Sequence, residues 1–302
     1  MSVDIEEIIA VVDAWRGRRV EWQEISGGLT NRNYRVDVDG EPHFVRIPGT
    51  ETGLLAVDRA NELANSRAAA AAGIGPRVLE HLPAWDVMVL EWLPGRTLSN
   101  TSASEPGMPG RLAEALRRLH GAPRFRDDFD MARLAARYLR VVDERAIPIP
   151  AGYREHLPLL PRVVAALAAR PLPPAPCHND LLAANLLDDD DRLWIVDYEY
   201  SGNGDPTFEL GNTCQELGWD DDRVEALALA YFGAYRDDQL ARMRLQMIMS
   251  DVGWTLWAAI QAAVSTIDYD FWGWAEERWQ RAATALDGPD LTTLLRASTG
   301  SA

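Results

Sequence analysis

Three polar residues near the middle of the chain have the types and the spacing that phosphoryl transfer to a hydroxyl requires. His178 begins a segment that reads H-x-D-x4-N, with Asp180 and Asn185 as its polar members, and Asp197 ends the apolar run that follows. Asp180 would orient the attacking hydroxyl, whereas Asn185 and Asp197 would hold a Mg²⁺ ion that bridges the phosphates of ATP. We therefore predict a catalytic site made of Asp180, Asn185 and Asp197, with the last two as metal ligands.

A glycine turn near the N-terminus is a candidate for the segment that holds the phosphates. It spans Ser26–Tyr34 and contains Gly28, Thr30 and Asn31. Glycine lets the backbone approach a phosphate closely, and the hydroxyl and amide groups can donate hydrogen bonds to it. A Gly-Gly turn alone is more often a simple hairpin. The downstream catalytic residues favour phosphate binding.

The chain contains no lysine, so an arginine must take the place of the lysine by which kinases grip the phosphates. Arg46 lies between apolar neighbours on a predicted strand, where an unpaired cation is costly. Glu62, on the predicted helix 57–72, is its expected partner. Arginine is always charged and binds phosphate bidentately, so Arg46 can replace the lysine. The role of Arg59 on the same helix stays open.

The composition sets broad limits on the class of protein. The chain has 302 residues, 47% of them hydrophobic, which is enough for one large domain or two lobes. It contains no run of apolar residues long enough to cross a membrane, and its acidic first residues predict no signal peptide. The net charge of −16 disfavours nucleic acid and favours cationic ligands. Two cysteines predict neither a disulfide framework nor a zinc site, so we expect a cytoplasmic protein.

The order of predicted elements divides the chain into two parts. Strands dominate up to residue 93, with Asp39-Gly40 as a hairpin turn and one helix over 57–72. Helices dominate from residue 94, and residues 289–302 are expected to be a weakly ordered tail. The predicted fold class is α+β, with an N-terminal nucleotide-binding lobe over 1–93 and a C-terminal catalytic and substrate-binding lobe over 94–302.

These motifs together resemble the aminoglycoside phosphotransferase and choline kinase superfamily, in particular its choline/ethanolamine kinase branch. The Asp–Asn spacing is also that of the protein-kinase catalytic loop. The resemblance implies a protein-kinase-like fold with a small antiparallel sheet in the N-lobe and a larger helical C-lobe. It implies that the backbone of Glu91 and Leu93 binds adenine in the hinge between the lobes. It also implies that Glu209 braces the catalytic loop where the family generally has Asp, and the role of Glu199 stays open.

Tryptophans near the C-terminus are the candidate acceptor site. Trp254 and Trp257 are three positions apart and so share one helix face. Spacing alone favours a packed core for such a stripe. The resemblance instead implies that Trp254, Trp257 and Trp274 wall a cage that binds a cationic amine by cation–π attraction, and Trp219 is a further candidate.

The leading hypothesis is an ATP- and Mg²⁺-dependent kinase that phosphorylates the hydroxyl of choline or ethanolamine. One alternative keeps the chemistry with an aminoglycoside or thiamine as acceptor, although the tryptophans disfavour an aminoglycoside. A nucleotide-binding pseudokinase is the non-enzyme alternative, and the intact Asp180, Asn185 and Asp197 disfavour it. We expect a monomer or homodimer with a small cationic alcohol as substrate, no nucleic-acid partner and no membrane insertion.

Overall fold

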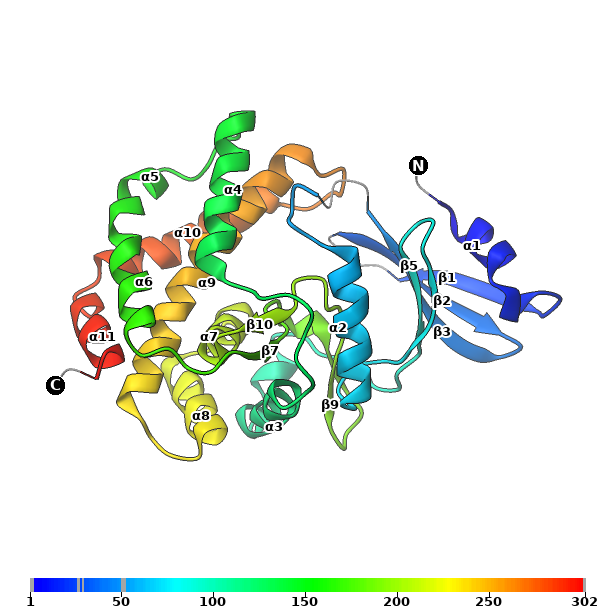
Figure 1. Cartoon of the computed structure of the whole chain (residues 1–302), viewed down its shortest axis with the longest axis horizontal. Coiled ribbons are helices and arrows are strands. Elements are labelled where there is room, and N and C mark those ends of the chain that lie inside the picture. Colours follow the sequence, from blue (N-terminus) through cyan, green and yellow to red (C-terminus); the bar gives the residue numbers. More distant parts are fainter. Residues whose placement is uncertain (1–2, 26–27, 29, 50–52, 301–302) are drawn as a thin grey trace.

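The computed structural model describes residues 3–25, 28, 30–49 and 53–300. Figure 1 shows an N-terminal sheet at one end of the molecule and a larger body of helices at the other, with helix α2 standing between them. The predicted division into a strand-rich N-terminal part and a helical C-terminal part is therefore confirmed. Ser26, Gly27 and Leu29 of the predicted glycine turn lie outside the described residues.

The N-terminal sheet is antiparallel, and its five strands follow the order β1-β2-β3-β5-β4. Their bounds are β1 Val20–Ile25, β2 Asn31–Val38, β3 Glu41–Pro48, β4 Val78–Leu82 and β5 Val87–Glu91. Asp39 and Gly40 form the turn between β2 and β3 with φ angles of 52° and 90°, as a hairpin of this type requires. Residues of α1 (Ile5–Val11) and of the turn η1 (Asp13–Trp15) share an apolar core with the sheet.

Helix α2 (Arg59–Ala71) docks on the C-terminal part mainly through polar groups, with Ala69 as a buried apolar contact. Asp58 caps its first turn by accepting from the Asn61 amide at 2.9 Å. The buried side chains of Asn61 and Asn65 both donate to the Ser201 carbonyl, at 2.9 and 3.1 Å. Directional hydrogen bonds therefore fix the position of this helix, and with it that of Glu62.

The C-terminal part consists of helices with short strands inserted at the cleft. Strands β6, β8 and β9 form one small sheet, and β7 and β10 form another. The element bounds are β6 Arg96–Thr97, η2 Ser102–Ser104, α3 Met108–His120, α4 Met131–Arg145, α5 Tyr153–His156, η3 Leu157–Leu159, α6 Leu160–Ala169, β7 Ala175–Cys177, η4 Ala183–Asn185, β8 Leu186–Asp188, β9 Leu193–Ile195, β10 Gly202–Gly204, α7 Pro206–Leu217, α8 Asp221–Phe232, α9 Asp237–Val264, α10 Phe271–Asp287 and α11 Leu291–Ser298.

Helix α9 is the centre of the C-terminal part. It contacts α4, α7, α10 and α11, and its side chains are buried almost all round between Gln239 and Gln261. A helix surrounded in this way needs no polar face. No helix in the described residues is both long enough and apolar enough to span a membrane.

The prediction of a weakly ordered tail over 289–302 was wrong for most of that segment. Residues Leu291–Ser298 form α11, which packs on α9 and α6. Leu291, Leu294 and Leu295 lie at helical spacing and belong to the largest apolar core or pack against it. Burial of these leucines stabilises a helix too short to form alone.

Candidate active site

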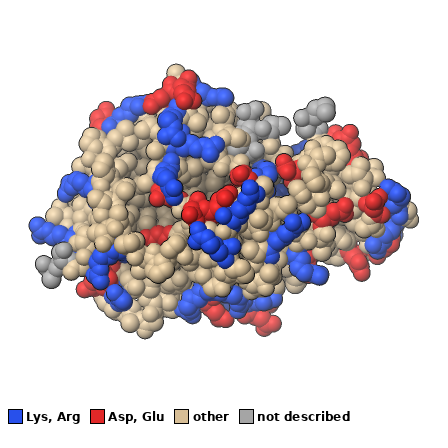
Figure 2. Space-filling model, in the orientation of Figure 1, with Lys and Arg blue, Asp and Glu red and all other residues tan. Residues whose placement is uncertain are grey.

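The three predicted catalytic residues meet in one cleft. Asp180 follows β7, Asn185 ends the 3₁₀ turn η4, and Asp197 follows β9. All three line a cleft of about 480 Å³, together with Gly28 and Thr30 from the N-terminal part. Figure 2 shows acidic and arginine side chains gathered around a hollow near the middle of the molecule.

The loop that carries Asp180 is held from below by Glu209 of α7. Glu209 is fully buried, and its carboxylate accepts from the backbone amides of His178 and Asn179, the latter at 2.9 Å. The ring of His178 contacts the Val196 carbonyl at 2.9 Å. The other ring nitrogen accepts from the Asp180 backbone amide at 3.3 Å, so both nitrogens have protein partners and the ring supports the loop; burial lowers the pKa of His178 and favours the neutral imidazole. Glu209 thus occupies the bracing position that the resemblance implies.

Backbone strain also marks the active-site loops. Asn179 and Asp197 adopt φ angles of 69° and 72°, in the left-handed region that side chains other than glycine rarely enter. The side-chain amide of Asn185 donates to the backbone carbonyl of Asp180 at 2.8 Å, which links two of the predicted catalytic residues directly. Such strain persists only where the surroundings hold it in place.

Arg46 is the charged centre of the cleft. It is 4% exposed and contacts Glu62 as predicted, and it also lies 2.9 Å from Asp197 and 2.8 Å from Glu199. Burial opposes the charge, but the three carboxylates outweigh it and raise the pKa of Arg46 further above its usual value. Arg46 therefore stays protonated and links the sheet to the segment that follows β9.

Glu199, whose role could not be assigned from the sequence, contacts four residues around the cleft. Besides Arg46, it accepts from the Thr30 hydroxyl at 2.8 Å and from the Asn31 amide at 3.1 Å. Arg59 lies 3.3 Å from it. Its position two residues after Asp197 indicated that both side chains lie on one face of the extended chain. Nothing in the sequence indicated that Glu199 contacts the glycine turn. The turn itself is tight, because a Cβ on Gly28 would lie 2.4 Å from the Asn31 carbonyl oxygen.

The cleft carries an excess of negative charge around Asp180. Burial raises the pKa of Asp180 well above its usual value, and the neighbouring Glu216, Asp197 and Glu199 raise it further. Arg46 is the one cation among the residues described as lining the cleft. A cationic ligand or metal would relieve this repulsion and favour the ionised carboxylate.

Three of the four predicted tryptophans line the same cleft as the predicted catalytic residues. Trp254, Trp257 and Trp274 lie there beside Tyr200. The rings of Trp257 and Trp274 meet edge to face with centroids 5.2 Å apart, and the Trp257 indole donates to the Tyr200 hydroxyl at 2.7 Å. Arg278 stacks on Trp274 with its guanidinium carbon 3.5 Å from the ring centre.

Trp219, the fourth predicted tryptophan, is not among the described residues that line this cleft. It follows the left-handed Gly218 at the end of α7 and is buried in a core cluster with Leu217 and Val224. The aromatic composition of the chain did not distinguish a core tryptophan from a cleft tryptophan.

The predicted hinge borders the cleft as well. Glu91, Trp92 and Leu93 all line it. The Glu91 amide donates to the Arg77 carbonyl at 2.9 Å, and its carboxylate contacts the Arg77 side chain at 3.1 Å. These contacts fix the path of the backbone from β5 into the C-terminal part.

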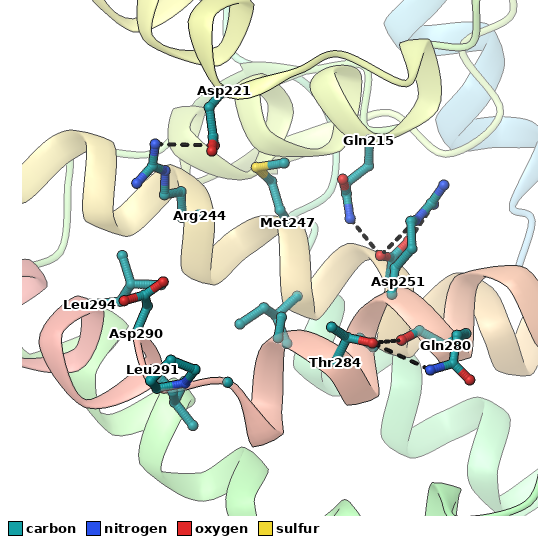
Figure 3. Close-up of a pocket in the computed structure, with 16 residues that line it drawn as sticks. Gln215, Asp221, Arg244, Met247, Asp251, Gln280, Thr284, Asp290, Leu291 and Leu294 are labelled. Atoms are coloured by element: carbon teal, nitrogen blue, oxygen red, sulfur yellow. Dashed lines mark hydrogen bonds and ion pairs between the residues drawn. The ribbon is translucent and has the colours of Figure 1, made fainter.

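A second hollow, of about 620 Å³, lies on the helical body and contains none of the predicted site residues. Figure 3 shows it between α9, α10 and α11, with Asp251 bonded to Gln215 and to an arginine at its rim. That arginine is Arg281, 2.6 Å from the Asp251 carboxylate. Because none of the predicted catalytic residues is among the described residues that line this hollow, we place the candidate active site in the first cleft.

One further group of side chains could in principle bind a metal. His120, Cys177 and Glu209 have potential ligand atoms within 4.8 Å of one another beneath the catalytic loop. The Glu209 oxygens already accept the two loop amides, and His120 contacts the Tyr231 hydroxyl at 2.6 Å. Protein contacts therefore account for this buried group.

Comparisons with known proteins agree with this site. The pattern of the family described as "Phosphotransferase enzyme family" matches residues 21–246. A choline/ethanolamine kinase family protein of known structure from Mesorhizobium loti is 36% identical, with a TM-score of 0.85 and 97% of each chain covered. Ethanolamine kinase 1 of Mus musculus is 26% identical over 91% of this chain and 88% of its own. Protein LicA of Haemophilus influenzae is 26% identical over 78% and 72%.

The chain therefore belongs to the phosphotransferase enzyme family, in its choline/ethanolamine kinase branch. It is a small-molecule kinase with a protein-kinase-like fold. The family resemblance and the fold class predicted from the motifs are confirmed.

Replacement of Glu209 by Gln should destabilise the protein and slow the reaction. The Gln amide turns a donor toward one of the two loop amides, which costs about 1–3 kcal/mol in the free energy of unfolding and loosens the loop that holds Asp180. Denaturant unfolding and kcat measure the two effects. The control is Glu225→Gln on the surface of α8, expected to change stability by less than about 0.5 kcal/mol. Equal behaviour of the two variants would remove the bracing role of Glu209.

Proposed function

We propose that this protein transfers the terminal phosphoryl group of ATP to the hydroxyl of choline or ethanolamine. The observation that carries the proposal is the position of Asp180 in one cleft between two groups of residues. Asp197 and Glu199, which both contact Arg46, act on the Asp180 charge from one group. Arg278, which stacks on Trp274, acts on it from the group of tryptophans, and the tryptophans line the same cleft. The acidic surroundings of Asp180 suit a cationic acceptor.

The residues fit a divalent cation. The Oδ1 atom of Asp197 is buried without a hydrogen bond, and its contact is the Arg46 guanidinium at 2.9 Å. The side-chain nitrogen of Asn185 donates to the backbone carbonyl of Asp180, so the side-chain oxygen of Asn185 is the atom left for a metal. Asn185 and Asp197 would hold Mg²⁺, whose preferred ligands are such oxygens. When bound, the ion neutralises charge that develops on the transferred phosphoryl group.

The protein's own groups position the reactants. The turn of Gly28, Thr30 and Asn31 would border the phosphates and Arg46 would bind them as a cation, while the backbone of Glu91 and Leu93 would hold adenine. The Asp180 carboxylate would accept a hydrogen bond from the acceptor hydroxyl and turn its oxygen toward phosphorus. Catalysis then comes from positioning and from charge neutralisation.

The aromatic end of the cleft supports an amine as the acceptor. Trp254 and Trp257 are fixed by hydrogen bonds from their indole nitrogens, to Asn212 at 2.8 Å and to Tyr200 at 2.7 Å. Rings held in this way are fixed walls of the cleft, and a cation placed over a ring face would gain about 0.5–2 kcal/mol when desolvated. An aminoglycoside site would need more carboxylates and fewer rings.

The proposal extends to the organisation of the chain. We propose a nucleotide-binding lobe over 1–93 and a catalytic and substrate-binding lobe over 94–302, with Leu93 at the junction. The two free, buried cysteines, Cys177 and Cys214, suit a reducing cytoplasm.

A coupled assay of ATP consumption tests the function directly. The purified protein with Mg²⁺ is given choline, ethanolamine, thiamine and a set of aminoglycosides, and the phosphorylated product is identified by mass spectrometry. We expect turnover with choline or ethanolamine. Turnover with an aminoglycoside alone would overturn the assignment of the acceptor, and nucleotide binding with no turnover would favour a pseudokinase.

Replacement of Asp180 by Asn should abolish most of the activity and leave the fold intact. Loss of the carboxylate that orients the hydroxyl should lower kcat by about 10²- to 10⁴-fold. Because Asn removes a buried charge repelled by its neighbours, the melting temperature should stay the same or rise. Steady-state kinetics and thermal unfolding measure both. Asp191→Asn, in an exposed turn, is the control, and full activity of Asp180→Asn would refute the assignment.

Replacement of Trp274 by Leu should weaken acceptor binding and leave the nucleotide site unchanged. Loss of one ring face should raise KM for the amine by about 2- to 30-fold, with KM for ATP unaffected. The control Trp22→Leu makes the same change on β1, outside the cleft. An unchanged KM for the amine would show that Trp274 packs the core and does not contact the acceptor.

A further inference from the structure

We propose that Arg59 is a positioning residue for the nucleotide, acting through Asn31 and Glu199. The inference rests on the proposed nucleotide site. Arg59 is not among the residues that line the cleft, and its side chain is 11% exposed. It therefore acts on the nucleotide through the residues that it holds.

Arg59 joins three acceptors from three segments. Its guanidinium lies 2.7 Å from Glu62 on its own helix, 2.9 Å from the Asn31 side-chain oxygen on β2, and 3.3 Å from Glu199 beyond β9. A planar fork of donors can satisfy acceptors in several directions, which a lysine ammonium on a flexible stem does less well. Arg59 thereby ties the glycine-turn end of β2 to the metal-binding segment.

The bond to Asn31 sets the direction of its amide group. Because the oxygen of Asn31 faces Arg59, its nitrogen faces the other way and donates to Glu199 at 3.1 Å and to the Thr30 hydroxyl at 2.9 Å. Thr30 in turn donates to Glu199 and lines the cleft. The position of the Thr30 hydroxyl at the cleft therefore depends on a group that lies behind it.

The charges in this group alternate. Glu62 and Glu199 each contact both Arg46 and Arg59, so two buried carboxylates are balanced by two guanidinium groups. Without Arg59, Arg46 alone would face both carboxylates and Asp197 as well. An uncompensated buried charge is strongly unfavourable. The group would relax by moving Glu199, and Thr30 and Asn31 would move with it.

The test is the affinity of the full-length protein for Mg·ATP and for a non-hydrolysable ATP analogue, measured by calorimetry without any acceptor. Arg59→Gln should weaken binding at least about tenfold, and Arg59→Lys should recover part of the loss because it keeps the charge and not the fork. The matched control is Arg67→Gln, an exposed arginine on the same helix, expected to bind as the wild type does.

A second pair of variants separates positioning from general stability. If Arg59 acts through Asn31, the double variant Arg59→Gln/Asn31→Ala should bind nucleotide no more weakly than Arg59→Gln alone. Losses that multiply in the double variant would overturn the route through Asn31. Wild-type affinity in Arg59→Gln, even with a lowered melting temperature, would overturn the positioning role. If Arg59→Gln does not fold, Arg59→Lys and Asn31→Ala decide, and wild-type affinity in both overturns the proposal.

The outcome is distinguishable from failure of the proposed function. Nucleotide binding by the wild type with no turnover of choline or ethanolamine would overturn the acceptor assignment and leave the comparison of Arg59 variants intact. Absence of nucleotide binding in the wild type would overturn the proposed function itself, and this inference with it.

Discussion

The buried contact of one arginine with three carboxylates is the constraint on which the site depends. Arg46 comes from β3, Glu62 from α2, and Asp197 and Glu199 from the segment after β9. None of these charges could be buried alone, because the loss of hydration would exceed what packing returns. The two parts of the molecule therefore have to meet with their charges matched, and that meeting forms the cleft. The absence of lysine makes the arrangement stricter, since the guanidinium stays charged wherever it is placed.

Hydrogen bonds rather than apolar packing set the fine geometry around this cluster. Asn61 and Asn65 hold α2 on the Ser201 carbonyl, and Glu209 holds the catalytic loop by its amides. Apolar contacts are adaptable in direction, whereas buried polar groups must find their partners at fixed angles. A kinase that works mainly by positioning needs this kind of support beneath its catalytic groups. The apolar cores instead place whole helices, α9 above all.

The sequence predicted those parts of the site that local spacing encodes. The H-x-D-x4-N segment leads into β8 and Asp197 follows β9, and because β8 and β9 pair with each other, the meeting of these residues follows from short-range order. The pairing of Arg46 with Glu62 could be predicted because each would otherwise be an unpaired charge. The contacts of Glu199 with Thr30 and Asn31 could not, because they join residues 169 and 168 positions apart and depend on how the two parts of the molecule dock. The burial of Trp219 and the formation of α11 could not be predicted for a related reason. Whether a tryptophan or a leucine stripe is buried depends on helices that are distant in the sequence.

The distribution of charge explains why the net charge of −16 had little predictive value. Many acidic residues face solvent, and exposed pairs such as Asp13 with Arg16, Glu21 with Arg19 and Asp143 with Arg154 each contribute little. The acidity that matters is local: Asp180 is half-buried near three other carboxylates, and its burial and these carboxylates together raise its pKa. An empty cleft of this kind is electrostatically unfavourable, and both a divalent metal and a cationic acceptor would relieve it. The proposed cationic substrate and the proposed metal would therefore both compensate the same excess of negative charge. Because the nucleotide brings negative charge of its own, Mg²⁺ held by Asn185 and Asp197 would, together with Arg46, offset that charge in the proposed site.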